Sequence, residues 1–404
     1  MVTQKPTVEQ KAIIIGSGIA GAAMALFLKK AGIKATVYEA YPRLTTIGGG
    51  MSLGPNGMNV LAELGLAEKI KSQAAPLERL HFRNQAGKRL AETSSGTIEK
   101  YGYTSMALHR SALLELVLDE ADRQGVEFEY EKRLTGYTEQ DNQVVAHFED
   151  GSTATGDYII GADGIHSKVR SVMLPNGPGP EYTGHVAIGG FVDEHYRAWD
   201  DSGDVKKTVL TFGPEGSFGY CNMSAGLPQW GWWSTYGQAK EPTKAELDAL
   251  TDDKLKQMLL KRHADWVAPV KDFINHSVLM IKTPIFDVPP LPTWHVGRAV
   301  LIGDAAHAMS PHAGQGASMA LEDAMYLAKM LRDYPFEQAV ERYQSARKDR
   351  AEKVCKTGRD NAARQVDATP GQARMRDVIM SIMLPLMGDR MQDWIFKYRI
   401  NWED

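Results

Sequence analysis

Two glycine-containing loops near opposite ends of the sequence carry its clearest chemical signals. The first is GSGIAG at residues 16–21, which follows the apolar run KAIII. The second is GDAAHAMSPHAGQG at residues 303–316, which follows the apolar run AVLI. Glycine turns between a strand and a helix bind phosphates, because backbone N–H groups and the positive end of the helix dipole face the anion. The pair predicts two binding points on one long cofactor.

The first loop is typical of a βαβ unit that binds a dinucleotide. Gly16 permits a tight turn, Gly18 lets the backbone approach a pyrophosphate, and Gly21 lets the helix pack closely on the strand. Ala20 lies at the start of that helix, and the next apolar run, KATVYEA, contains Glu39, placed to accept hydrogen bonds from a ribose diol. The unit alone does not distinguish NAD from FAD, because both contain an ADP half.

The second loop carries a carboxylate and two histidines. Asp304 directly follows the apolar run, where it is placed to bind a sugar or polyol hydroxyl. His312 lies just before the next helix. It is interpreted either as an acid–base group that acts near neutral pH or as a solvated loop histidine. His307 is interpreted as structural. The two histidines are five residues apart, which does not fit a metal pair on a helix, and no metal site is predicted.

A third motif, DYIIGADGIHSKVR at residues 157–170, places Asp163 after a buried strand. The three motifs, in this order, resemble the single-component FAD-dependent aromatic hydroxylases, the para-hydroxybenzoate hydroxylase-like flavoprotein monooxygenases. The resemblance spans about residues 11–350. It implies that the first loop binds the ADP half of FAD and the second loop binds the ribityl chain and isoalloxazine.

The resemblance also implies roles for single residues. Glu39 matches the family's adenosine-ribose ligand, and Arg110 an arginine beside the ribityl chain and phosphates. Asp304 matches the aspartate near the ribityl chain and pyrophosphate, and Asp163 one that serves FAD and NAD(P)H use. The other FAD positions implied are Ser52 in IGGGMSLGPNG and, in the second loop, Gly314, Gly316 and Ala317. Ser318 stands where many relatives carry Asn.

The chemistry implied by the resemblance is hydroxylation of an aromatic or N-heteroaromatic small molecule. In the family, NADH or NADPH reduces the flavin, O2 adds at flavin C4a, and the resulting hydroperoxide transfers one oxygen atom. A polycyclic phenol or antibiotic stays open as the substrate. So does other flavin chemistry on this fold, such as an epoxidase, halogenase or reductase, although Trp230 and Trp232 lack the isoleucine-proline that follows them in halogenases.

The middle of the chain is rich in glycine and aromatic residues and is expected to form the sheet that covers the substrate. Tyr220 and His312 are the candidate catalytic residues. The candidate substrate contacts are Phe212, Phe218, Asn222, Met223, Trp232 and Tyr236. Strand alternation places Phe218, Tyr220 and Asn222 on one face of the sheet, but it does not show whether that face looks inward.

The predicted fold class is α/β, with a Rossmann-like FAD-binding domain, an inserted and mostly antiparallel β-sheet substrate domain, and C-terminal helices. The FAD-binding domain is expected at 1–177 and 291–365, the substrate domain at 178–290, and a helical tail at 366–404. The methionines of that tail, from Met375 onward, are expected to pack mainly into a core, with contact to a partner as the alternative.

Composition and charge argue against nucleic acid binding and against a membrane span. The 404 residues have a formal net charge of −4, with no basic and aromatic patch that suggests nucleic acid binding. Cys221 and Cys355 lie far apart, and together with the polar N-terminus they favour a reducing, cytoplasmic location. The best apolar run, residues 378–387, is too short to span a membrane. A monomer or a homodimer is expected.

Overall fold

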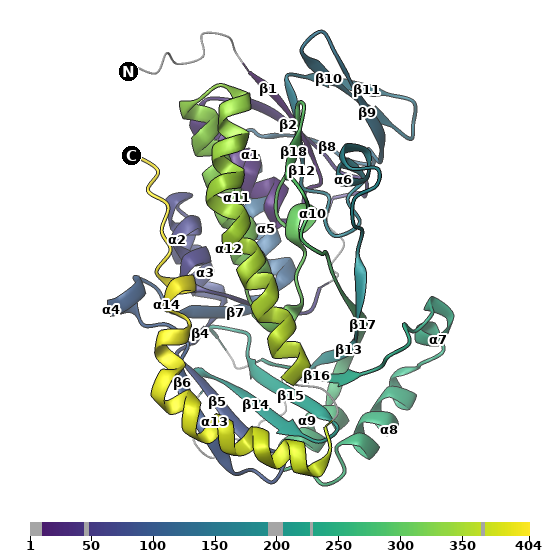
Figure 1. Cartoon of the computed structure of the whole chain (residues 1–404), viewed down its shortest axis with the longest axis vertical. Coiled ribbons are helices and arrows are strands. Elements are labelled where there is room, and N and C mark those ends of the chain that lie inside the picture. The colour runs from purple at the N-terminus through teal and green to yellow at the C-terminus, as the bar shows by residue number, and fades with distance from the viewer. Residues whose placement is uncertain (1–9, 44–47, 193–204, 227–228, 365–367) are drawn as a thin grey trace.

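The computed structural model describes the chain in five stretches: residues 10–43, 48–192, 205–226, 229–364 and 368–404. In Figure 1 these form an upper body around a six-stranded sheet and a lower body around a seven-stranded sheet. Two long helices, α11 (Gly316–Asp333) and α12 (Phe336–Arg364), run side by side along the molecule. This mixed α/β architecture confirms the predicted fold class.

The upper sheet is the Rossmann-like part, with strand order β18-β19-β12-β1-β2-β8. Its strands are β1 (Lys11–Ile15), β2 (Lys34–Tyr38), β8 (Glu127–Glu129), β12 (Tyr158–Gly161), β18 (His295–Val296) and β19 (Ala299–Leu301). All neighbours pair in parallel except β18 and β19. The central runs are apolar because both faces of this parallel sheet are covered, one by helices that include α1 and the other by the strands β10 and β11 described below.

On the helical side of this sheet, α1 packs against both α5 and α11. The remaining upper helices are α1 (Ile19–Ala31), α2 (Pro55–Glu63), α3 (Ala67–Gln73), α4 (Ile98–Tyr101), α5 (Arg110–Arg123), α6 (Lys168–Met173), α10 (Asp304–His307) and the 3-10 turn η1 (Pro311–Ala313). Two three-stranded sheets complete the body: β3 (Gly50–Leu53), β7 (Ser105–His109) and β4 (Ala75–Leu77), and β9 (Leu134–Gln140), β10 (Gln143–Phe148) and β11 (Thr153–Gly156).

The lower sheet has the order β17-β13-β16-β15-β14-β5-β6 and is antiparallel except where β14 pairs with β5. Its strands are β5 (Arg79–Asn84), β6 (Arg89–Ser94), β13 (Glu181–Val192), β14 (Lys207–Gly213), β15 (Gly216–Asn222), β16 (Trp230–Gly237) and β17 (Ser277–Asp287). Strands β5 and β6 precede residue 178, so the predicted boundary of the substrate domain does not include the whole sheet.

The two faces of the lower sheet have different neighbours. One face forms an apolar core with α8 (Asp252–Arg262) and α9 (Val270–Asn275), near α7 (Lys244–Asp248). The opposite face, which we call the inner face, looks toward the upper body. There the ring of Phe191 stacks on His109 of β7, with centroids 4.3 Å apart, and Met223 lies against Gly50 of β3.

The C-terminal helix α13 (Pro370–Met391) runs along the outside of the lower body, and the short helix α14 (Asp393–Phe396) that follows it packs on α2 and Tyr101 of the upper body (Figure 1). The expectation that the tail methionines pack into a core is wrong for four of them, because Met375, Met383, Met387 and Met391 are 45–67% exposed. Helix α13 packs on β6 with its other side. None of the helices described here is long and apolar enough to cross a membrane.

Candidate active site

The two glycine loops, distant in sequence, are neighbours in space at Gly303. This residue has a positive φ of 56° and lies between the N-terminal parts of α1 and α11. A Cβ atom at Gly303 would be 3.1 Å from the Cβ of Ala20 and 3.2 Å from the Cβ of Ala320. Only glycine combines that conformation with so close an approach. Two helix N-termini therefore converge on one small region.

The first loop has two crowded glycines and one open glycine. Gly16 has a φ of 98°, and a Cβ there would be 2.6 Å from the carbonyl oxygen of Ala162. A Cβ at Gly21 would be 1.9 Å from the carbonyl oxygen of Gly16, whereas a Cβ at Gly18 would meet nothing within 4 Å. No side chain caps α1, and its first turn has no acidic residue. The start of α1 is therefore suited to an anionic group.

Glu39 joins the first loop to the end of β2. Its Oε2 atom accepts hydrogen bonds from the backbone N–H of Ser17 at 2.8 Å and from the Ser17 hydroxyl at 2.9 Å. Its Oε1 atom accepts from the backbone N–H of Tyr41 at 3.0 Å. The carboxylate is thus held in one orientation beside the open turn, where a ribose is expected.

The second loop repeats the arrangement of the first. Helix α11 begins at Gly316 without a side-chain cap or an acidic first turn, and a Cβ at Gly316 would meet nothing within 4 Å. The hydroxyl oxygen of Ser52 lies 3.4 Å from the Cβ position of Gly314, which brings β3 beside the loop. Asp304 begins α10 and is exposed, and Ala317 lies in the first turn of α11.

The contacts of Ser318 give a physical reason for a serine where many relatives carry Asn. Its side chain is fully buried, and its hydroxyl accepts a hydrogen bond from the backbone N–H of Gly54 at 3.1 Å. A Cβ at Gly57 would lie 2.7 Å from the same hydroxyl oxygen. The compact side chain therefore lets α2 and α11 approach closely.

Arg110 and Asp163 take up different positions around the loops. Arg110 is exposed at the start of α5, and its backbone N–H donates to the carbonyl of Gly49 at 3.1 Å. The carboxylate of Asp163 instead accepts from the Ser167 hydroxyl at 2.5 Å and from the N–H of Lys168 at 2.7 Å. Asp163 therefore orders the first turn of α6, a role that the sequence did not indicate.

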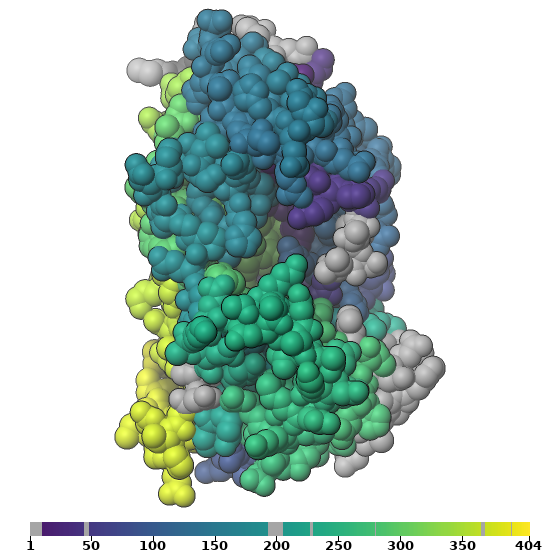
Figure 2. All heavy atoms as spheres, turned by 90° about the vertical axis from the view of Figure 1, so that its right-hand side faces the viewer, coloured from purple at the N-terminus to yellow at the C-terminus, as the bar shows by residue number. Residues whose placement is uncertain are grey.

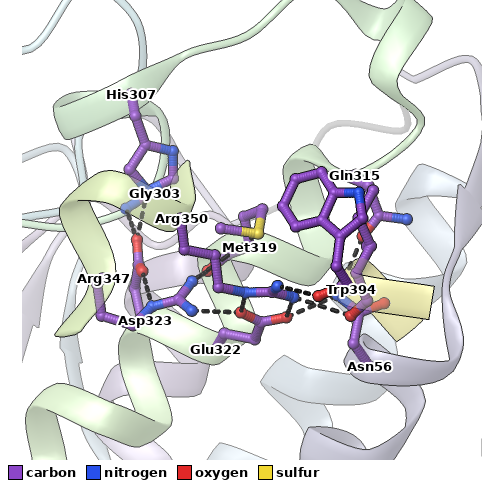
Figure 3. A network of polar contacts seen from close by, with 11 residues as sticks. Asn56, Gly303, His307, Gln315, Met319, Glu322, Asp323, Arg347, Arg350 and Trp394 are labelled. Carbon is purple, nitrogen blue, oxygen red and sulfur yellow. Dashed lines mark hydrogen bonds and ion pairs between the residues drawn. The ribbon is translucent and has the colours of Figure 1, made fainter. Parts of the chain in front are cut away.

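A buried ionic network supports the second loop from behind (Figure 3). Asp323 accepts hydrogen bonds from the backbone N–H of Gly303 at 3.0 Å and from Arg347 Nε at 2.9 Å, and its Oδ2 lies 2.5 Å from Nε2 of His307. Burial raises the pKa of Asp323, but His307 and Arg347 outweigh it and lower that pKa to about 2. The interpretation of His307 as structural agrees with this geometry.

The same network reaches α2 and the C-terminal segment through Glu322. This carboxylate accepts from Asn56 Nδ2 at 2.6 Å and from Arg350 at 2.9 Å, and it pairs with Arg347. Asn56 also donates to Gln315, the residue before α11, at 3.0 Å. Sequence reasoning missed this network. The available signal was two adjacent carboxylates on an otherwise apolar helix, in MALEDAM.

The structure separates the predicted substrate contacts. Phe218, Tyr220, Trp232 and Tyr236 belong to the core beneath α8 and α9, away from the upper body. The rings of Phe218 and Trp232 stack at 5.2 Å, and Tyr220 meets Phe273 edge to face at 5.0 Å. These four side chains therefore do not lie on the face of the sheet that looks toward the upper body, where the substrate is expected. Aromatic side chains suit either face of a sheet, so the sequence pattern could not select one.

The other candidates lie elsewhere. Asn222 organises a turn, since its side chain donates to the carbonyl of Ser224 at 2.8 Å and accepts from the N–H of Gln229 at 2.9 Å. Met223 packs on the inner side with Cys221. Phe212 also belongs to the inner face by strand alternation, and Arg376 of α13 lies over its ring at 5.3 Å.

The inner face fronts a partly open space. Several of its small or apolar residues are only half-buried, unlike the sealed core on the other side. They are Ala187, Gly189, Leu210, Trp233 and Ile281. Figure 2 shows the surface recessed between the blue and teal atoms of the upper body and the green atoms of the lower body. Sequence reasoning missed these residues because their types carry no chemical signal.

Two histidines meet beside this space. The rings of His185, on β13, and His312, in η1, are 6.2 Å apart. Nδ1 of His312 bonds the Ser310 hydroxyl at 2.7 Å, and its Nε2 is buried with no hydrogen-bond partner among the described residues. Burial, and secondarily His185, lowers the pKa of His312 to about 4, and burial also lowers the pKa of His185. Both rings are therefore neutral at pH 7.

Comparison with known proteins agrees with this geometry. The family model described as an FAD binding domain matches residues 9–357. The chain is 32% identical to a 6-hydroxynicotinate 3-monooxygenase from Pseudomonas fluorescens, covering 88% of this chain and 92% of that protein. It is also 32% identical to an FAD-dependent urate hydroxylase from Klebsiella pneumoniae, covering 84% and 86%.

Solved structures show the same fold. The crystal structure of Klebsiella pneumoniae HpxO complexed with FAD and uric acid matches with a TM-score of 0.85 and 26% identity, covering 97% of this chain and 98% of that chain. A salicylate hydroxylase substrate complex matches with a TM-score of 0.79 and 27% identity, covering 97% and 96%. The chain therefore belongs to the FAD-binding domain family of flavoprotein hydroxylases and is an FAD-dependent monooxygenase.

Proposed function

We propose that this monooxygenase uses NAD(P)H and O2 to hydroxylate a planar, uncharged phenol or N-heteroaromatic. The observation that carries the proposal is the chemistry of the inner face. From His185 to Phe191 on β13, and along β14, β15 and β16, none of the strand positions on this face is Lys, Arg, Asp or Glu. An apolar wall with a few neutral polar groups favours an uncharged ring over a carboxylate.

The residues present fit FAD. Two uncapped helix starts with open glycines suit the pyrophosphate and the electron-rich edge of a reduced ring, since helix N-termini stabilise negative charge. We assign Glu39 to the adenosine ribose, Arg110 and Asp304 to the phosphate and ribityl region, and the loop that contains Ser52 and Gly314 to the ring. When bound, FAD supplies the redox chemistry of O2 activation.

The protein's own part in the reaction is to place the substrate and move a proton. We assign the tautomer in which Nδ1–H of His312 donates to the Ser310 hydroxyl, which leaves Nε2 as the available acceptor. A ring hydroxyl or N–H that donates a hydrogen bond to Nε2 and shifts its proton toward His312 in the transition state becomes more electron-rich, which favours attack on an electrophilic oxygen. A bound substrate ring that fills the space would keep water from the reacting atoms.

The substrate class is testable with the purified, FAD-loaded protein. We expect uncharged hydroxypyridines and phenols to stimulate NADH or NADPH oxidation and to gain one oxygen atom by mass spectrometry. Carboxylated analogues of the same rings serve as matched controls and should stimulate less. Preferential turnover of the carboxylates would contradict the proposed substrate class, and stimulated oxidation without oxygen transfer would contradict hydroxylation.

Replacing His312 by asparagine should lower substrate-stimulated turnover by about 100-fold, because the proton acceptor is lost. FAD content should not change. The control is His276→Asn, an exposed histidine at the end of α9. In the wild type, the pKa of about 4 keeps His312 in its active neutral form well below pH 6.5. The acid limb of kcat should therefore lie near pH 4 to 5 and disappear in the variant. An unchanged rate and pH profile would assign the proton transfer elsewhere.

A further inference from the structure

Helix α13 presents a continuous apolar stripe to solvent. Of the twelve large apolar side chains that are well exposed in the described part of the chain, eight belong to this helix. They are Met375, Val378, Ile379, Ile382, Met383, Leu386, Met387 and Met391, and their exposed fractions range from 45% to 72%. They recur every three or four residues and so share one face over about four turns.

The stripe is not the result of a loosely attached helix, because the opposite side of α13 is well anchored. Asn84 of β5 donates to the Asp377 carboxylate at 3.1 Å, and the Arg376 guanidinium lies over Phe212. A Cβ at Gly388 would be only 2.2 Å from the Thr93 side chain of β6. One side of α13 is thus closely fitted to β5 and β6, whereas the apolar side faces solvent.

We propose that a second copy of this chain covers the stripe, by pairing of α13 with α13 across a two-fold axis. At these exposed fractions the eight side chains offer roughly 800 Å² of surface, which is about the area that each partner buries in a standard stable interface. A patch of this size exceeds the roughly 300–600 Å² found as the largest patch on typical monomers.

The charge pattern supports a protein partner over a lipid surface. Among the described side chains of α13, the exposed charges are Arg374 and Arg390, one at each end of the stripe. An apolar centre with an arginine-bearing rim is the usual anatomy of a dimer interface. A helix that lies in a membrane surface instead has a strongly charged polar face beside its apolar one. On α13 that side is packed on β6.

Two-fold symmetry makes a positional prediction. With the two α13 helices antiparallel, the two-fold axis crosses the stripe at its midpoint, which therefore lies next to the same residue of the partner. The midpoint of the stripe is at Ile382 and Met383, whereas Met375 and Met391 lie at the ends and face each other across copies. Flexible methionines suit such a contact because they adapt to one another.

The test uses the full-length, FAD-loaded protein in detergent-free buffer. We expect light scattering after size exclusion to give the mass of two chains at micromolar concentration. The double variant Ile382→Lys/Leu386→Lys should give the mass of one chain with unchanged FAD content. Val278→Lys is the control, since Val278 is 63% exposed on β17, away from α13.

Two further measurements fix the position of the axis and the kind of partner. Met383→Cys should form an intermolecular disulfide with itself under mild oxidation, whereas Met375→Cys should not. Vesicles of phosphatidylcholine and phosphatidylglycerol should not sediment the protein. A wild type that is monomeric throughout, a double variant that stays dimeric, or a monomer that binds the vesicles through α13 would each overturn the proposal.

Discussion

The variant Arg347→Met is expected to lower the free energy of unfolding by about 3–5 kcal/mol, because it leaves buried carboxylates with one cation fewer. Arg347, Glu322 and Asp323 are all buried, with at most 1% exposure. Glu322 would keep Arg350, and Asp323 would keep His307, but each would lose its contact with the central guanidinium. For a chain of this length the change corresponds to a fall in Tm of about 4–6 °C, which differential scanning calorimetry measures.

The matched control removes another cation from the same helix. Lys356 is 73% exposed and pairs with Asp360 four residues later at 2.8 Å. Lys356→Met should therefore cost at most about 0.5 kcal/mol, because exposed ion pairs contribute little. Arg347→Met should also weaken FAD binding, since Asp323 holds the N–H of Gly303. Equal stability of the two variants would show that the buried network contributes no more than a surface pair.

The variant Gly18→Ala is expected to weaken FAD binding by at least about tenfold, while the stability of the FAD-free protein stays the same. The added methyl group meets no protein atom within 4 Å, and Gly18 has an ordinary φ of −64°. The methyl group fills the space predicted for the pyrophosphate, so it destabilises the FAD-bound state and not the FAD-free protein. Tenfold corresponds to about 1.4 kcal/mol. Fluorescence titration of the apoprotein with FAD measures this change.

Gly21→Ala provides the contrasting variant in the same turn. Its methyl group would lie 1.9 Å from the carbonyl oxygen of Gly16, so strand β1 and helix α1 must move apart. We expect this variant to lose stability without FAD as well as with it. If Gly18→Ala binds FAD with the wild-type affinity, the phosphates do not approach the backbone at Gly18.

The parts of the site that bind FAD were predictable because their chemistry depends on backbone geometry. A turn with a positive φ at Gly16, or a close approach at Gly21, needs glycine, and that need is visible in the sequence. The fold class followed from the same motifs. Family membership then named the cofactor, which the βαβ unit alone did not.

The substrate side was not predictable for equally physical reasons. Phe218 and Tyr220 alternate with Gly219 and Cys221 along β15, and both sets suit a half-buried strand. Only the packing of α8 and α9 decides that the aromatic set is covered and that Gly219 looks inward. The exposure of the tail methionines was not predictable for a related reason. Apolar residues recur with the same helical spacing whether the stripe faces a core or the surface.

The lower sheet is built from two separate segments of the chain, with β14 lying between β15 and β5. Strands β5 and β6 are therefore synthesised long before the strands that complete their sheet. Until β14 is synthesised, the edge of β5 that pairs with it has no partner strand. A graft of residues 178–290 into a related hydroxylase would carry only five of the seven strands. It would leave β14 to pair with a foreign β5, and such an edge is prone to slip or aggregate. Exchanging substrate preference between relatives thus requires residues 79–94 to travel with the insert.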